Sequence, residues 1–134
     1  MKKQIYILAS LLLVSGTTLA QKGSVKRADK LFEMRAYNQA AETYENQKRT
    51  QEVLQNLADS YYYNTSLQKA IKTYRELFVE YGDSIDIEYH FRFAQSLKGV
   101  KNYSEADKHL SRYYNKPVNT SAFIETIKNT TPHS

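Results

Sequence analysis

The sequence predicts an all-α fold, an α-solenoid of three helical hairpins closed by a further C-terminal helix. Three observations carry this prediction. After residue 20, apolar residues recur three and four positions apart, which is the period of an amphipathic helix. Glycine and proline, which interrupt helices, account for only 4 and 2 of the 134 residues. One pattern of small and bulky residues also returns three times along the chain.

The first twenty residues differ from the rest and resemble a secretory signal peptide. Lys2 and Lys3 give a positive start, and a run without charged residues follows over 5–19. Thr18 and Ala20 supply small residues at the −3 and −1 positions of a cleavage site. The alternative is a membrane anchor, but the apolar core of about ten residues is shorter than the ~20 of a spanning helix. We therefore expect residues 1–20 to be removed on export, leaving no spanning helix.

Charge and cysteine content narrow the classes of partner. The chain has 19 basic and 14 acidic residues, net +5, and removing Lys2 and Lys3 leaves 17 against 14, net +3. The basic residues are scattered among acidic ones, whereas binding to nucleic acid needs a basic stripe. We therefore expect no nucleic-acid partner. The absence of cysteine excludes disulfides.

The repeated pattern covers 28–44, 58–74 and 94–110, at offsets of 30 and 36 residues. In each copy a small residue is followed three positions later by a bulky one. After a loop, an alanine precedes a large apolar residue by four positions. Small side chains let two helices approach, and a large ring fills the space beside them. The residues assigned to this repeat core are Ala28, Ala40, Tyr44, Ala58, Tyr61, Ala70, Tyr74, Ala94, Leu97, Ala106 and Leu110.

The helices follow in order from this pattern. We expect them near 24–36, 38–48, 51–64, 66–81, 84–98 and 103–115. A seventh helix is expected from about residue 119, with Phe123, Ile124 and Ile127 on one face. It would cover the open apolar face of the last hairpin. The helical domain would thus span 21–128, and 129–134 would be a tail or the start of a linker.

Several residues mark expected helix ends. Thr65 with Gln68, and Ser104 with Asp107, fit capping boxes at the starts of the fourth and sixth helices. Gly82 is expected to end the fourth helix, and the adjacent Asp83 or Ser84 is expected to cap the fifth.

The spacing resembles the tetratricopeptide repeat, in which an aromatic residue or leucine stands three positions before the alanine. Tyr37, Leu67 and Tyr103 hold that position. The offsets of 30 and 36 depart from the 34 residues of the motif, and alanine replaces its common glycine. The alternative is an unrelated helical bundle.

The amino-acid sequences of three segments resemble those of a known protein family. The segments "RADKLFEMRAYNQAAETYE", "LADSYYY" and "HFRFAQSLKGVKNYSEADKHL" look like the N-terminal part of OmpA-family envelope proteins of the Bacteroidota. In that family, tetratricopeptide repeats precede a β-propeller and a peptidoglycan-binding domain, and some members serve type IX secretion and gliding. The resemblance implies an address in the periplasm or at the outer membrane. It also implies a scaffold that docks envelope proteins or their peptide segments. Cell-wall binding is not implied, because those further domains are not in this chain.

No pattern predicts catalysis, a metal or a cofactor. His90, His109 and His133 lack the spacing of a zinc site. No glycine-rich phosphate loop or nucleophile motif is present. We therefore expect a protein that is not an enzyme.

A partner-binding groove is the main functional hypothesis, because in tetratricopeptide proteins the first helix of every hairpin lines the concave face. The repeat register places there Asp29, Phe32, Glu33, Gln55, Asp59, Tyr62, Tyr63, Phe91, Gln95 and Lys98. Exposed aromatic residues ringed by acids would suit a peptide with apolar anchors and basic flanks. One alternative is a small-ligand or peptidoglycan-fragment site in the same groove. Another alternative is that Tyr62 and Tyr63 pack against neighbouring hairpins and do not line a groove.

Two further points concern modification and assembly. Residues 83–85, with Ser84 at their centre, resemble the O-glycosylation site of exported Bacteroidota proteins, and the alternative is an ordinary helix cap. Self-association through the ends of the repeats is also compatible with the sequence, which leaves the oligomeric state open.

Overall fold

The computed structural model describes residues 23–115, which are helical and contain no strand. A helix over 23–33 is followed by α2 (Tyr37–Glu45), α3 (Gln51–Tyr63), α4 (Leu67–Tyr81), the 3-10 helix η1 (Gly82–Ser84), α5 (Ile87–Gly99) and α6 (Tyr103–Tyr114). The prediction of an all-α fold is confirmed, and the six expected helices occur in the expected order. The signal peptide, the seventh helix and the tail lie outside the described residues.

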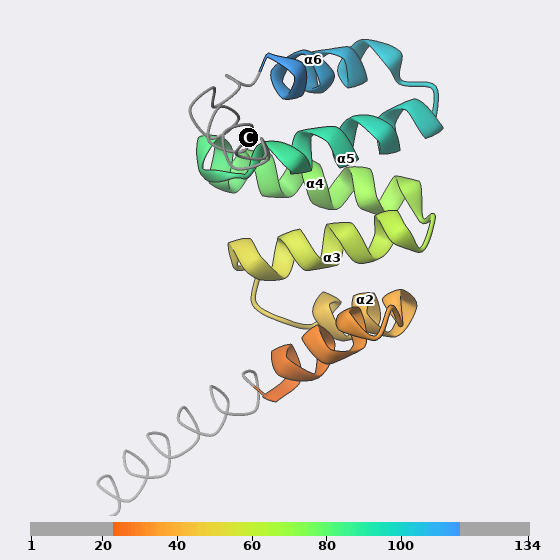
Figure 1. The fold of residues 1–134 in the computed structure, drawn as a ribbon. Coiled ribbons are helices and arrows are strands. Elements are labelled where there is room, and N and C mark those ends of the chain that lie inside the picture. The colour runs from red at the N-terminus through yellow and green to blue at the C-terminus, as the bar shows by residue number, and fades with distance from the viewer. Residues whose placement is uncertain (1–22, 116–134) are drawn as a thin grey trace, which may run out of the picture.

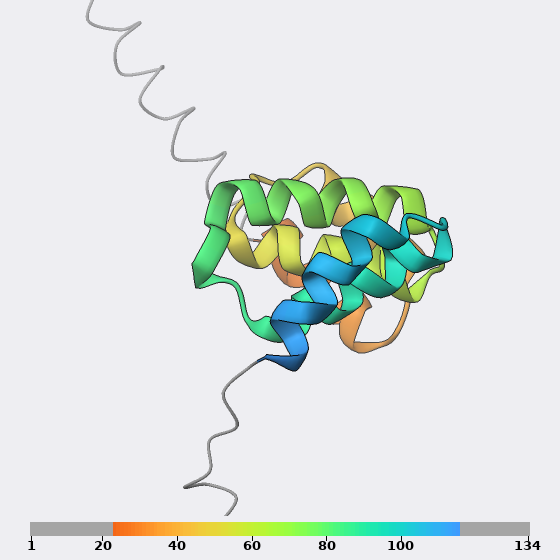
Figure 2. The ribbon, with the colours of Figure 1, turned by 90° about the horizontal axis from the view of Figure 1, so that it is seen from above.

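The helices form a stack in chain order (Figure 1). Each of the helices α2 to α6 packs against the next, and α3 also contacts α5. Seen along the stack, α6 runs at an oblique angle to α4 (Figure 2). Most of the helix contacts are therefore made between neighbours in the sequence.

The core alternates small and large side chains, as the repeated pattern predicts. Ala28, Ala40, Ala58, Ala70, Ala94 and Ala106 are all fully buried. Tyr44, Tyr61, Tyr74 and Leu97 are buried too, and Leu110 is partly buried against the same core. Full burial of a large apolar side chain stabilises a fold by roughly 1.5–3 kcal/mol. The core residues of the pattern thus join the helices into one packed unit.

One turn geometry recurs in all three hairpins. Arg35, Thr65 and Lys101 have positive φ angles of 60°, 59° and 64°. In each turn the amide of this residue donates to the carbonyl three residues back, and the next amide donates to the carbonyl five residues back. This is the Schellman motif that ends many helices, with a side-chain-bearing residue in the usual place of glycine. The three left-handed residues are separated by 30 and 36 positions, the same offsets as the sequence repeat.

The capping-box predictions are wrong. Thr65 lies in the left-handed turn, and its hydroxyl donates to the Asn64 carbonyl at 2.7 Å. The N-cap of α4 is the following serine, which makes no side-chain cap bond. The start of α6 is capped by Asn102, whose Oδ1 accepts from the Glu105 amide at 3.4 Å. The Schellman turns moved both starts, because the left-handed residue and the one after it precede the helix.

The prediction for the connection between α4 and α5 is partly right. Gly82 follows the last residue of α4 with φ 45°, as expected for a helix terminator. The N-cap of α5 is Asp86 rather than the predicted Asp83 or Ser84. The Asp86 side chain accepts a hydrogen bond from the Glu88 amide at 2.9 Å. Ser84 is exposed in η1, and its hydroxyl donates to the Tyr81 carbonyl at 2.8 Å.

The first two hairpins differ in the length of their second helix. Helix α2 has 9 residues and α4 has 15, which accounts for the change of offset from 30 to 36. The additional residues lie at the C-terminal end of α4. From there the Tyr81 hydroxyl donates to the Arg49 carbonyl at 3.1 Å, in the connection between α2 and α3.

Candidate functional site

A tyrosine–aspartate hydrogen bond closes each of the first two hairpins. The Tyr44 hydroxyl donates to Asp29 Oδ1 at 2.5 Å, and the Tyr74 hydroxyl donates to Asp59 Oδ1 at 2.6 Å. In both pairs the tyrosine follows the aspartate by 15 residues. Burial, and then the neighbouring carboxylate, raises the pKa of both tyrosines, which keeps them neutral donors.

The next hairpin contributes one more polar residue to each pair. Asn56 donates to the Tyr44 hydroxyl at 3.2 Å, and Arg92 Nε donates to Asp59 Oδ1 at 2.8 Å. Asn56 and Arg92 both stand two positions before the small residue that opens their repeat. The third repeat has Gln95 and Leu110 where the first two have the aspartate and tyrosine. The polar linkage therefore joins successive hairpins and stops at the third.

This linkage corrects the expected ring of exposed acids. Asp59 is only 6% exposed, because it lies between Tyr74 and Arg92. Burial raises the pKa of the Asp59 carboxyl, and Arg92 and Tyr74 oppose that rise. Asp29 is half-buried, and Glu33 is exposed. Of the three predicted groove acids, only Glu33 is therefore exposed to basic residues of a partner peptide.

The three consecutive tyrosines of α3 face different surroundings. Tyr61 is 6% exposed, Tyr62 is half-buried against the core and Tyr63 is 46% exposed. Successive residues of a helix point about 100° apart, so the three rings fan around the axis. Tyr63 is therefore the one large exposed ring of the three.

Tyr63 belongs to a group of four rings, which we call the aromatic cluster. Its centroid lies 5.0 Å from Tyr37 in a stacked arrangement, 5.2 Å from Tyr62 and 6.4 Å from Phe32. The Phe32 and Tyr37 rings meet edge to face at 5.4 Å. Tyr37 was not among the predicted groove residues, because it starts the second helix of its hairpin. The sequence signal that could have identified Tyr37 is its position three residues before the repeat alanine Ala40.

The other predicted groove residues are spread along the first helices. Gln55, Phe91 and Gln95 are half-buried, and Lys98 is exposed. The Phe91 ring lies 5.0 Å from that of Tyr113 on α6, outside the aromatic cluster. The structure thus gathers the Phe32, Tyr62 and Tyr63 part of the predicted set and leaves the α5 part separate.

The histidines of α5 and α6 form a partly buried contact. The Nδ1 atoms of His90 and His109 lie 2.7 Å apart, so one ring donates a hydrogen bond and the other accepts it. The rings of Phe78 and Phe93 pack against the His109 ring, at 5.3 and 4.5 Å. Burial, and then the neighbouring His90, lowers the pKa of His109 to about 4. The contact joins α5 to α6, and the lowered pKa keeps the His109 ring neutral near pH 7.

Within residues 23–115, no group of three histidine, aspartate or glutamate side chains is arranged to hold a metal ion. No helix in that range is both long and apolar enough to cross a membrane. The candidate site therefore consists of the aromatic cluster and the polar linkage that fixes the helices beneath it. No known family model matches the chain, and a search of curated proteins found no match.

Proposed function

We propose that the chain is an exported docking module that binds protein partners, built as a solenoid of three tetratricopeptide-like hairpins. The repeat assignment is supported by the three equivalent Schellman turns and by the two equivalent tyrosine–aspartate bonds. The C-terminal capping helix belongs to the same proposal, since a solenoid needs its last apolar face covered.

The observation that carries the docking role is the exposed and supported ring of Tyr63. The ring is 46% exposed and is held by stacking on Tyr37 and by contact with Tyr62. A ring that is ordered before binding loses little conformational entropy when a partner packs on it. Tyrosines of this kind dominate the energetics of many protein interfaces. The aromatic cluster is thus suited to an aromatic or aliphatic side chain of a partner peptide.

The cellular setting follows from the resemblance to OmpA-family envelope proteins. The module works in the periplasm or at the outer membrane, as the first part of such a protein. Its partners are envelope proteins or their peptide segments. Ser84 is its O-glycosylation site, a position supported by the exposure of this serine in η1.

A selection of random displayed peptides against the full chain tests the docking role. We expect the enriched peptides to share an aromatic or aliphatic anchor. The substitution Tyr63→Ala should weaken their binding by about tenfold, or 1.4 kcal/mol. The matched control is Tyr103→Ala, which removes a ring that is 57% exposed on α6, outside the aromatic cluster. Equal binding by both variants, with unchanged melting temperatures, would remove the cluster from the binding surface.

A further inference from the structure

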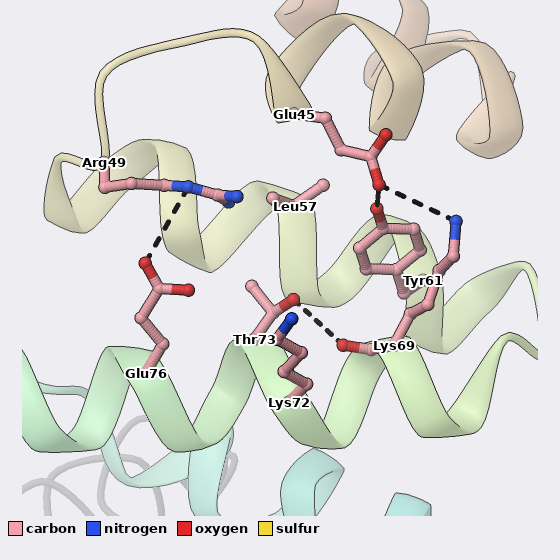
Figure 3. Close-up of a pocket in the computed structure, with 8 residues that line it drawn as sticks. All are labelled: Glu45, Arg49, Leu57, Tyr61, Lys69, Lys72, Thr73 and Glu76. Atoms are coloured by element: carbon pink, nitrogen blue, oxygen red, sulfur yellow. Dashed lines mark hydrogen bonds and ion pairs between the residues drawn. The ribbon is translucent and has the colours of Figure 1, made fainter.

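A pocket opens between α2, α3 and α4 (Figure 3). Its volume is about 150 Å³, and it is lined by Glu45, Arg49, Leu57, Tyr61, Lys69, Lys72, Thr73 and Glu76. Tyr61 and Tyr63 are two positions apart on α3 and point about 200° apart. The pocket is therefore separate from the aromatic cluster. At roughly 300 Å³ and above, pockets hold drug-sized ligands, so this one suits a small ion.

The charged residues of the pocket leave hydrogen-bond donors available. Three cationic side chains face two carboxylates, which gives a net charge of one positive. Arg49 Nε lies 3.7 Å from Glu76 Oε1, and Lys69 Nζ lies 3.7 Å from Glu45 Oε1. Both distances exceed that of a hydrogen bond. The guanidinium and the ammonium therefore keep N–H groups that a bound anion could use.

One of the two carboxylates of the pocket already accepts a hydrogen bond. Glu45 accepts from the Tyr61 hydroxyl, and burial followed by this carboxylate raises the pKa of Tyr61, which keeps it a donor. The Thr73 hydroxyl donates to the Lys69 carbonyl at 2.9 Å. Lys72 lines the pocket and pairs with no carboxylate among the described residues. A ligand thus meets an excess of positively charged donors.

We propose that this pocket binds a small oxyanion, a phosphate or carboxylate group, between Arg49 and Lys72. Arginine presents paired N–H groups that match two oxygens of such a group, and lysine adds a point charge. Leu57 and Thr73 line the same pocket between the charged residues. Figure 3 shows the Arg49 side chain extending from the connection before α3 and Lys72 lying on α4. The site does not depend on the docking function proposed above.

The test is an NMR titration of the full chain with inorganic phosphate and, separately, with succinate at constant ionic strength. We expect saturable shifts of the Leu57, Tyr61 and Thr73 amides, with a Kd of about 1 mM or tighter. The substitution Lys72→Gln should weaken binding by about tenfold, or 1.4 kcal/mol. The control is Lys108→Gln, which removes the same charge from an exposed position on α6.

Each outcome decides the proposal. Saturation by phosphate alone would assign a phosphate site, saturation by succinate alone a carboxylate site, and saturation by both a general oxyanion site. Shifts that stay linear with both anions would overturn it, because they indicate only screening of surface charge. Equal weakening by Lys72→Gln and Lys108→Gln would overturn it as well, because a bound ion must contact the first and not the second.

Discussion

Arg92 on α5 donates through Nε to Asp59 Oδ1 on α3 at 2.8 Å, across the boundary between two hairpins. Their side chains are 20% and 8% exposed, so the ion pair is largely removed from water. The same oxygen accepts the Tyr74 hydroxyl from the intervening helix. One carboxylate therefore holds three helices of the stack.

Replacing Arg92 by methionine should destabilise the fold by about 3 kcal/mol, because Asp59 would remain buried with its charge uncompensated. Urea unfolding at pH 7 measures this loss. The control is Arg75→Met, which breaks the more exposed Arg75–Glu105 pair, with side chains 50% and 29% exposed. That change should cost less than about 1 kcal/mol. Equal losses in the two variants would mean that Asp59 is solvated.

The Schellman turn between α3 and α4 should become more stable with glycine at its left-handed residue. A side chain at positive φ costs roughly 1–2 kcal/mol, and glycine avoids this cost but adds backbone entropy to the unfolded chain. Thr65→Gly should therefore stabilise the fold by about 0.5–1 kcal/mol, and Thr65→Ala by less.

Thermal unfolding measures the effect, with Thr43→Gly inside α2 as the opposite case. There the same exchange should destabilise by about 0.3 kcal/mol, because φ is already helical and glycine is a weaker helix former than threonine. Destabilisation by Thr65→Gly would show that φ at this turn is negative in solution.

The histidine contact predicts how stability depends on pH. The pKa of His109 falls from 6.5 to about 4 on folding, so the unfolded chain binds this proton more readily. Stability should therefore decrease as the pH falls from about 6.5 to 4, by on the order of 2 kcal/mol after allowance for partial exposure. Glu105, Arg112, Arg75 and His90 also act on His109.

Urea unfolding at several pH values, compared between the native chain and His109→Leu, isolates this contribution. The variant should lose the part of the pH dependence that lies between about 4 and 6.5. An NMR titration in which the His109 ring protonates near its ordinary pKa would contradict the prediction directly.

Overpacking the middle hairpin should be costly. Ala70 is fully buried on α4, and leucine there should destabilise the fold by about 1–3 kcal/mol. Gln68→Leu, at an exposed position of the same helix, is the control and should change stability by less than about 0.5 kcal/mol. Equal melting temperatures of the native chain and Ala70→Leu would mean that this alanine does not lie at a close helix crossing.

The sequence was sufficient for the helices and their core because both depend on local spacing. An alanine such as Ala70, four positions before Tyr74, already fixes which face of a helix is buried. The repeated aspartates Asp29 and Asp59 were also visible at the 30-residue offset. Their bonds to tyrosine were not, because a residue that fits a groove in the repeat register can equally turn toward its own hairpin.

The contacts between hairpins could not be predicted from spacing alone. The Asp59–Arg92 pair spans 33 residues, and it forms only because α3 and α5 pack against each other in the stack. Tyr37 was missed for a related reason, since its contact with Tyr63 joins the start of one helix to the end of another. The N-caps predicted at Thr65 and Ser104 were misplaced because capping rules favour hydroxyl side chains, whereas the left-handed turns set the boundaries.

The longer second helix of the middle hairpin limits how far the repeats are interchangeable parts. Tyr81, on the added length of α4, fastens the connection that carries Arg49. A chimera with the middle hairpin trimmed to the length of the first would retain its paired helices but release that connection. Repeat shuffling or consensus redesign of this protein should therefore treat α4 and the α2–α3 connection as one inherited unit.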